Sequence, residues 1–273
     1  MAFQLDHEII DPPDDVPGET ALFVHGIMGS ARNWRSFAQR FVAAMPRFRA
    51  VLVDLRHHGR SRGAPPPDDL EACAKDLDRL VERLGPIQVV IAHSFGGKVA
   101  IRWMEHRPPE LHQVFILDCP LSAVPVEAAA NTEVARVLAA IAAIPEPISR
   151  RSLVQEKLLA LGHPPALAGW MATNLARAAD GFHWTFDRLG IGRLIEDYWS
   201  RDLRAAAAHP PEGVRVDLVR ALESDRWTSA ELAFLASLPE GGATRVHEMA
   251  DVGHWLHTDD PEGLLRLLSR CLG

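Results

Sequence analysis

Cysteine is scarce in this chain of 273 residues, which has only Cys73, Cys119 and Cys271. An odd and small number of thiols argues against a disulfide framework of the kind that supports small secreted domains. No C-x-x-C pair occurs, and the spacing of histidines, cysteines and carboxylates lacks the pattern of structural zinc sites, so we expect no metal site. Three unpaired thiols are typical of a protein from a reducing compartment.

The sequence also lacks a long apolar run. Its best candidate for a membrane stretch, residues 137–144, lies between Arg136 and Pro145, and is far shorter than the roughly 20 residues that a spanning helix needs. The first residues lack the basic and apolar segments of a secretory signal. We therefore expect a cytoplasmic protein with no membrane span.

An excess of positive charge is absent as well. Lys and Arg number 29 against 36 Asp and Glu, which gives a formal net charge of −7. General nucleic-acid binding needs a basic surface, so this composition argues against a nucleic-acid partner. No G-x-G-x-x-G motif follows an apolar run, and no dinucleotide cofactor is indicated. With 47% hydrophobic residues, the chain is able to bury a large core.

What the chain does contain is an alternation of short apolar runs with helical patterns. The runs are rich in β-branched residues, as in strands that are buried on both faces. Strands are predicted over residues 20–24, 49–54, 86–92, 113–118 and 214–221. Helices are predicted over residues 34–45, 68–84, 97–106 and 261–271. This order predicts an α/β fold, with a mostly parallel twisted sheet and helices on both faces.

The alternation stops between residues 121 and 211. This stretch is rich in Ala, Leu and Trp and is broken by prolines, which predicts four or more short helices and no good strand. Because the strand pattern resumes at Val214, the stretch is interpreted as an insertion into one domain. We predict a core formed by residues 1–120 and 212–273, with a helical cap over residues 121–211.

Ser94 is the strongest candidate for a catalytic nucleophile. It lies directly between a predicted strand and a predicted helix, in the sequence Ala-His-Ser-Phe-Gly over residues 92–96. An abrupt turn from strand to helix strains the residue at the turn, and small residues two positions before and after it let the two elements approach. Ala92 and Gly96 meet this requirement, so the hydroxyl would project near the positive end of the helix. The alternative is an ordinary turn that contains a serine.

A serine hydroxyl needs a base that removes its proton. His254 is the best candidate among 13 histidines because it lies late in the chain, directly before the last predicted helix. His257 is the nearby rival, and His247 is disfavoured because it lies in a strand. The base in turn needs an orienting carboxylate. Asp118 and Asp225 both lie at the carboxyl ends of predicted strands, where open α/β sheets place their chemistry, and the residues alone leave this choice open.

Negative charge that develops on a substrate oxygen needs two backbone N–H donors. We expect one from Phe95, directly after the nucleophile, and one from Ile27 in the loop over residues 25–29. His25 is interpreted as fixing that loop, and the charged segment 54–61 as bracing the mouth of the site. Tryptophans are candidates for lining an apolar substrate pocket, with core packing as the alternative; they are Trp34, Trp184 and Trp255, together with Trp170 and Trp199.

Four segments together resemble the α/β-hydrolase superfamily. They are His-Gly-Ile-Met-Gly at 25–29, Asp-Leu-Arg-His-His-Gly-Arg-Ser at 54–61, Ala-His-Ser-Phe-Gly-Gly-Lys at 92–98 and Gly-His-Trp at 253–255. The second and third are similar to those of a serine esterase group in that superfamily, the ABHD11-type and YbfF-type hydrolases. Residues 181–187 resemble a segment of the cap in that group.

The resemblance implies the α/β-hydrolase fold with an inserted cap, and it bears on the choice of acid. Position 92 is Ala where Gly is commonest, which is a small change. Many relatives carry the acid after the later strand, where this chain has Ser224 with Asp225 one residue on. The resembled group often carries it after the earlier strand, which favours Asp118. Relatives with an aspartate nucleophile differ at Ser94, because a serine suits acyl transfer.

The implied activity is that of a serine carboxylesterase that hydrolyses small to medium apolar acyl or aryl esters through an acyl-enzyme. Its partner would be a small-molecule ester, and no cofactor is needed. The same residues would serve carbon–carbon bond hydrolysis or cofactor-free perhydrolysis. A ligand-binding protein on this scaffold is a further alternative, and the oligomeric state is not predicted.

Overall fold

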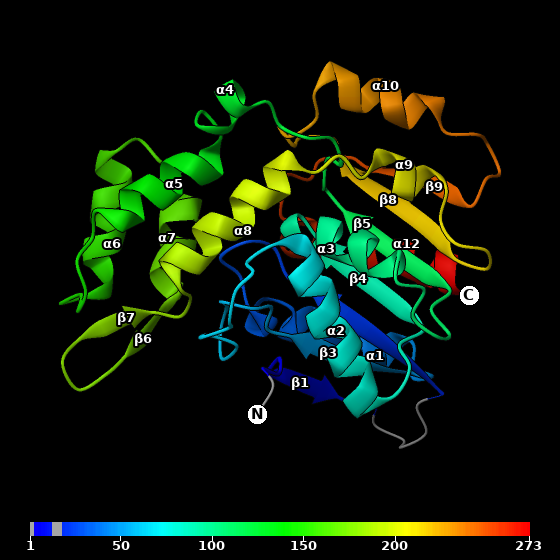
Figure 1. Ribbon diagram of the computed structural model, residues 1–273, viewed down its shortest axis with the longest axis horizontal. Coiled ribbons are helices and arrows are strands. Elements are labelled where there is room, and N and C mark those ends of the chain that lie inside the picture. Colours follow the sequence, from blue (N-terminus) through cyan, green and yellow to red (C-terminus); the bar gives the residue numbers. More distant parts are fainter. Residues whose placement is uncertain (1–2, 13–17) are drawn as a thin grey trace.

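The computed structural model describes residues 3–12 and 18–273, within which seven strands form one sheet (Figure 1). The strand order is β1-β3-β2-β4-β5-β8-β9, with β1 antiparallel to β3 and all other neighbours parallel. The strands are β1 (His7–Ile10), β2 (Glu19–Val24), β3 (Phe48–Val53), β4 (Val89–His93), β5 (Gln113–Leu117), β8 (Arg215–Ala221) and β9 (Thr244–Met249). The predicted α/β class with a mostly parallel sheet is confirmed.

The central strands are apolar because both of their faces are covered. Every residue of β4 and β5 is buried, and the register places Ile91 beside Phe23 on one side and Phe115 on the other. The edge strand β1 is different, because three of its four residues are only partly buried and Ile9 is exposed. A strand so short and so exposed carries no clear periodicity, which is why the sequence pattern predicts no strand there.

Helices cover the two faces of the sheet and form two separate apolar cores. On one face, Phe41 of α1 and Leu268 of α12 pack in the same core as Phe23 of β2. On the other face, Leu77 of α2 and Val99 of α3 belong to a second core. The helices around the sheet are α1 (Arg35–Ala44), α2 (Leu70–Leu84), α3 (Phe95–Met104), α10 (Ser229–Ser237), α11 (Leu256–Asp259) and α12 (Pro261–Leu272), with a 3-10 turn at Ala31–Asn33.

The bounds of α2 follow from local chemistry. The Asp69 carboxylate accepts a hydrogen bond from the Ala72 N–H (2.7 Å) and so caps the first turn. The helix ends at Gly85, whose φ of 88° is a backbone conformation that favours glycine. Between these ends one apolar face is buried, including Leu77 and Leu80.

Most of the chain between β5 and β8 forms a lobe beside the sheet, at the left in Figure 1, whereas its last helix lies at the right and contacts α3. This stretch, which is described throughout, holds α4 (Val126–Ala129), α5 (Glu133–Ala142), α6 (Arg151–Ala160), α7 (Pro165–Thr173), α8 (Arg188–Ser200), α9 (Arg204–Ala208), β6 (Leu175–Arg177) and β7 (Phe182–Trp184). The expectation that it contains no strand is wrong, since β6 and β7 pair antiparallel. Strands of three residues are too short to show a period in the sequence. The cap limits at residues 121 and 211 stay a prediction.

The sheet brings distant loops together at one edge. Parallel strands share the edge at which their carboxyl ends lie, so the loops that follow β2, β4 and β5 meet there. These loops carry residues 25–29, Ser94 and Asp118 respectively. The loop after β9 adds His254. The polar residues of interest therefore lie at the edge that the sheet topology dictates.

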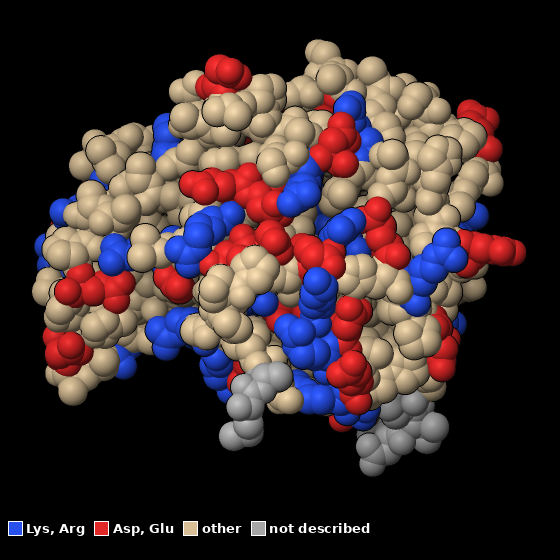
Figure 2. Space-filling model, in the orientation of Figure 1, with Lys and Arg blue, Asp and Glu red and all other residues tan. Residues whose placement is uncertain are grey.

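The surface over α2 and α8 carries both signs of charge. Figure 2 shows acidic and basic side chains alternating on this face. Ion pairs account for part of the pattern, as between Arg102 and Glu71 (2.9 Å) and between Arg201 and Asp197 (2.6 Å). No helix in the described part of the chain combines the length and the hydropathy that crossing a membrane requires.

Candidate active site

Ser94 occupies a strained bend between β4 and α3. Its φ of 52° and ψ of −121° are rarely adopted by a residue with a side chain. Close packing around the bend enforces this conformation: a Cβ on Gly96 would lie 2.7 Å from the His25 carbonyl oxygen, and one on Gly97 would lie 2.8 Å from the Cβ of Cys119. The bend holds Ser94 at the amino end of α3, as the small-x-Ser-x-Gly pattern requires.

His254 connects Ser94 to Asp118. Its Nε2 lies 3.1 Å from the Ser94 Oγ, and its Nδ1 lies 2.7 Å from Asp118 Oδ2. Because a carboxylate only accepts hydrogen bonds, Nδ1 carries the proton and donates it, which leaves Nε2 free to accept from the serine hydroxyl. Burial lowers the pKa of His254, against the opposing effect of Asp118. The ring is therefore a neutral base at neutral pH.

Asp118 is fully buried and its carboxylate accepts four hydrogen bonds. The donors are His254 Nδ1 (2.7 Å), the Ser224 hydroxyl (2.5 Å), Trp227 Nε1 (2.6 Å) and the Ala221 N–H (3.1 Å). Burial by itself would raise the pKa of Asp118, but the hydrogen bonds from His254, Ser224 and Trp227 lower it below its usual value. The group is thus an anion held in one orientation.

The other carboxylate candidate lies apart from the base. The Asp225 side chain is 93% exposed, and its ion pair is with its neighbour Arg226 (3.5 Å). Ser224, which precedes it, instead donates to Asp118. The structure therefore brings Asp118, and not Asp225, to His254.

The rival histidines have other surroundings. His257 lies against Trp34, with ring centroids 4.4 Å apart, and burial lowers its pKa to about 4. His247 Nε2 donates to the carboxylate of Asp217 (2.7 Å). Neither histidine is hydrogen-bonded to Ser94 in the described structure.

Two buried histidines hold the loop over residues 25–29. His25 Nδ1 donates to the Gly26 carbonyl (2.7 Å) while its Nε2 accepts from the Leu55 N–H (3.0 Å). His58 Nε2 accepts from the Met28 N–H (3.0 Å). Burial lowers the pKa of His25 to about 4 and that of His58 well below its usual value, so both rings are neutral and keep one acceptor nitrogen. The segment 54–61 thereby braces the loop that carries Ile27.

The two backbone N–H groups expected to bind the substrate oxygen lie at the start of a helix and in a loop. Phe95 is the first residue of α3, where backbone N–H groups have no partner within the helix. Ile27 directly precedes Met28, whose N–H donates to His58. The Ile27 N–H itself has no acceptor among the described residues. Both donors are therefore available to a bound oxygen.

Sequence reasoning assigned no role to His93, which precedes the nucleophile. Its Nε2 donates to the His254 carbonyl oxygen (2.7 Å), and burial lowers its pKa well below the usual value. The two rings lie 4.6 Å apart, so His93 fixes the backbone that carries the base. Its position beside Ser94 in the sequence was the one available signal.

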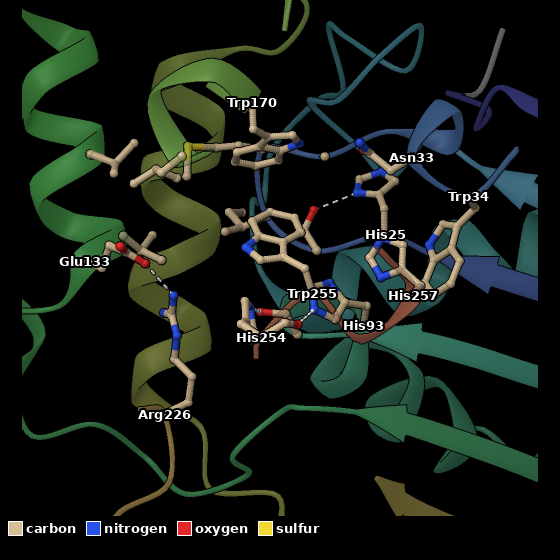
Figure 3. Close-up of a pocket in the computed structure, with 18 residues that line it drawn as sticks. His25, Asn33, Trp34, His93, Glu133, Trp170, Arg226, His254, Trp255 and His257 are labelled. Atoms are coloured by element: carbon tan, nitrogen blue, oxygen red, sulfur yellow. Dashed lines mark hydrogen bonds and ion pairs between the residues drawn. The ribbon is translucent and has the colours of Figure 1, made fainter. Parts of the chain in front are cut away.

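A small cavity of about 40 Å³ adjoins Ser94 and His254 (Figure 3). Trp34 and Trp255 line it, together with Trp170, whose ring lies 4.6 Å from that of Trp255. The cap adds three aliphatic side chains to the wall: Val134, Val137 and Leu167. The expected role of Trp184 is wrong, because its buried ring stacks on Phe186 (5.2 Å) and does not line this cavity.

An ion pair closes one side of the same cavity. Arg226, from the loop after β8, donates to Glu133 of α5 (2.6 Å), and both line the cavity wall (Figure 3). The pair joins the core to the cap next to the base. No local pattern predicts this ion pair, because the two residues lie far apart in the chain.

One group of side chains in the described residues could hold a metal ion. Asp217, His247 and Cys271 lie with one ligand atom each within 4.8 Å of one another. They are distant from each other in sequence, so motif spacing did not predict the cluster. Asp217 lies early in β8, away from the carboxyl edge where Ser94 lies, and its carboxylate already bonds His247 and Gln113.

Comparisons with known proteins show what the chain as a whole is similar to. The model of the alpha/beta hydrolase family matches residues 21–267. The chain is 26% identical over 267 residues to the sn-1-specific diacylglycerol lipase ABHD11 of Mus musculus, covering 96% of this chain and 82% of that protein. It is 29% identical over 261 residues to the lipase LipV of Mycobacterium tuberculosis, covering 92% of each. A solved structure of a marine microorganism esterase has a TM-score of 0.79 at 22% identity, covering 98% of this chain and 99% of that one.

Proposed function

This chain belongs to the alpha/beta hydrolase family and acts on esters, and on that premise we propose that it is a serine carboxylesterase. The observation that carries the proposal is the continuous chain of hydrogen bonds from Ser94 through His254 to Asp118, at 3.1 Å and 2.7 Å. This is the arrangement that makes a hydroxyl nucleophilic at neutral pH.

In the proposed reaction, Ser94 Oγ attacks the ester carbonyl while His254 Nε2 takes its proton. The buried Asp118 anion holds the ring in the required tautomer and stabilises the imidazolium that forms. The Ile27 and Phe95 N–H groups stabilise the oxyanion, and losing one such donor typically costs about 10²–10³ in turnover. His254 then gives its proton to the departing alcohol, and water, activated by the same ring, hydrolyses the acyl-enzyme.

The cavity supports a small apolar acyl group as the preferred substrate. Its volume of about 40 Å³ and its tryptophan and aliphatic walls leave room for few atoms next to Ser94. A longer acyl chain requires the cap residues Val137 or Leu167 to move. We therefore place the substrate among small-molecule esters with short apolar or aryl acyl groups.

The test is turnover of p-nitrophenyl esters from acetate to octanoate. We expect kcat/KM to be highest at the short end, and Ser94→Ala to abolish turnover of every ester while folding normally. Ser237→Ala, an exposed serine on α10, is the matched control. A fluorophosphonate probe adds a direct readout, because it labels a competent serine and leaves Ser94→Ala unlabelled. Equal activity or equal labelling in the wild type and Ser94→Ala would remove Ser94 from the mechanism.

A further inference from the structure

A second, larger cavity lies beside the catalytic one. It has a volume of about 500 Å³ and is walled by core residues 30–35 and 59–62 and by cap residues around Asn174. Asn33 lines both cavities. On the cap side, α7 contributes Trp170 to the catalytic cavity and Thr173 to the larger one. The two cavities therefore share the same two walls, a core loop and α7.

The larger cavity has a surplus of positive charge. Four arginines line it, Arg32, Arg35, Arg60 and Arg62, against the carboxylates of Glu8 and Asp54. The Glu8 carboxylate forms an ion pair with Arg35 (2.6 Å).

Asp54, the other carboxylate in the wall, forms no ion pair with an arginine among the described residues. Asp54 is buried and accepts from the backbone N–H groups of Ala31 (2.7 Å) and Arg60 (2.9 Å). The Arg60 side chain pairs with Asp6 (2.9 Å), outside the cavity wall. Within residues 3–12 and 18–273, Arg32 and Arg62 have no carboxylate partner. The Arg62 guanidinium donates to the carbonyl oxygen of Trp184 (3.1 Å), which holds it in place.

A buried amide in the same wall also lacks a partner. Asn174 is 6% exposed, and its Nδ2 has no acceptor among the described residues. Its backbone is fixed, because its carbonyl accepts from both the N–H and the hydroxyl of Thr185. A buried N–H without an acceptor is unfavourable, and a bound acceptor removes that cost.

From these observations we infer that the larger cavity binds an anionic group, a carboxylate or a phosphate, through Arg32, Arg62 and Asn174. Planar guanidinium groups match such anions in shape and charge. The shared walls suit an ester whose reacting carbonyl lies at Ser94 and whose far end is anionic. This assignment of a substrate class rests on the proposed esterase function, whereas binding of the anion itself does not.

The first arm of the test compares matched esters. Acetate esters of ω-hydroxy carboxylic acids and monomethyl esters of dicarboxylic acids are measured against neutral alkyl acetates and methyl alkanoates of equal length. We expect the anionic ester of optimal length to have a kcat/KM about 10-fold above its neutral counterpart, the size of a charge-assisted contact. The double variant Arg32→Gln, Arg62→Gln should lose this preference and keep its turnover of p-nitrophenyl acetate.

Arg40→Gln is the matched control, because Arg40 is exposed, pairs with Glu262 and does not line the cavity. The second arm measures binding of inorganic phosphate by calorimetry to Ser94→Ala, with and without the two arginine substitutions. If phosphate binding depends on the two arginines but the arginine double variant keeps the wild-type ratio of kcat/KM between anionic and neutral esters, the cavity binds a free anion and not the end of an ester. Failure of both arms would overturn the inference. If the wild type has no esterase activity, the proposed function is wrong. Calorimetry would then still test whether the cavity binds an anion.

Discussion

At the scale of single residues, the buried Asp118 is the group on which the base depends. Its carboxylate has no lysine or arginine partner among its hydrogen-bond donors and is stabilised by four neutral donors, among them Ser224 and Trp227. These donors leave one oxygen directed at His254 Nδ1. The arrangement fixes the tautomer of the ring, and a wrong tautomer places a proton where Nε2 must accept one.

We expect Asp118→Asn to lower kcat for p-nitrophenyl acetate about 10⁴-fold, because an amide no longer enforces the tautomer or stabilises the imidazolium. Asp225→Asn, which alters an exposed carboxylate, should leave kcat unchanged. Thermal unfolding of both variants checks that the buried substitution has not unfolded the protein. If Asp225→Asn is inactive and Asp118→Asn is active, the acid is Asp225 and not Asp118.

Sequence reasoning reached Ser94 and His254 because local patterns mark both positions. The sequence patterns of a strand, of a bend with small neighbours and of a helix all occur within a few residues of Ser94. The acid has no such mark. The surroundings that hold Asp118 in place come from Ser224 and Trp227, which lie more than 100 residues away in the sequence. These contacts exist only once β5 and β8 are paired.

At the scale of elements, the buried Lys98 of α3 ties the cap to the helix that begins at the nucleophile. Its Nζ donates to the carbonyl oxygens of Ser122 (2.7 Å), Tyr198 (2.9 Å) and Arg201 (2.5 Å). Ser122 lies where the chain leaves the core, and Tyr198 and Arg201 lie where α8 returns to it. The buried Glu231 of α10 accepts from the Ser122 N–H (2.7 Å), so opposite charges flank this crossing point. Burial lowers the pKa of Lys98 to about 8, which leaves it charged at neutral pH.

Replacing this lysine should therefore destabilise the whole protein. We expect Lys98→Met to reduce the free energy of unfolding by about 3 kcal/mol or more, because three buried carbonyl groups lose their donor. Lys75→Met on the exposed face of α2 removes only an i,i+4 pair with Glu71 (3.3 Å), worth about 0.5 kcal/mol. Urea denaturation measures both. Equal losses in the two variants would show that Lys98 does not clamp the cap.

The last helix was predictable, and the shortest strands were not. The last helix was predicted at 261–271 and ends at Leu272, because a full apolar face and a proline start define it. The strands of the β6–β7 hairpin have three residues each and gain their stability from pairing with each other and from the bridge between Ile148 and Phe182. Such pairing is a tertiary property that no window of sequence contains.

At the scale of the whole molecule, the proposed active site draws on both the core and the cap. The core supplies Ser94, His254 and the loop over residues 25–29, while α5 and α7 supply aliphatic residues of the cavity wall and α5 supplies Glu133. The insertion itself was predictable because the strand pattern stops and resumes. The packing of its helices was not predictable, and the error about Trp184 follows from that. The ring is aromatic and lies in the cap, but it is buried against Phe186 and belongs to an apolar core that continues into the sheet.

In the proposed function the closeness of cap and core sets the acyl preference, and substitution of Leu167 in α7 tests this. It lines the cavity of about 40 Å³ and is only partly buried, so its truncation opens space without removing a core anchor. We expect Leu167→Ala to raise kcat/KM for p-nitrophenyl octanoate relative to acetate about 10-fold, the scale of a few methylene contacts. Leu159→Ala, which truncates an exposed leucine of α6 outside the cavity, should leave the ratio unchanged. If both variants keep the ratio of the wild type, the wall that α7 forms does not limit the acyl chain, and the acyl group must extend from Ser94 in another direction.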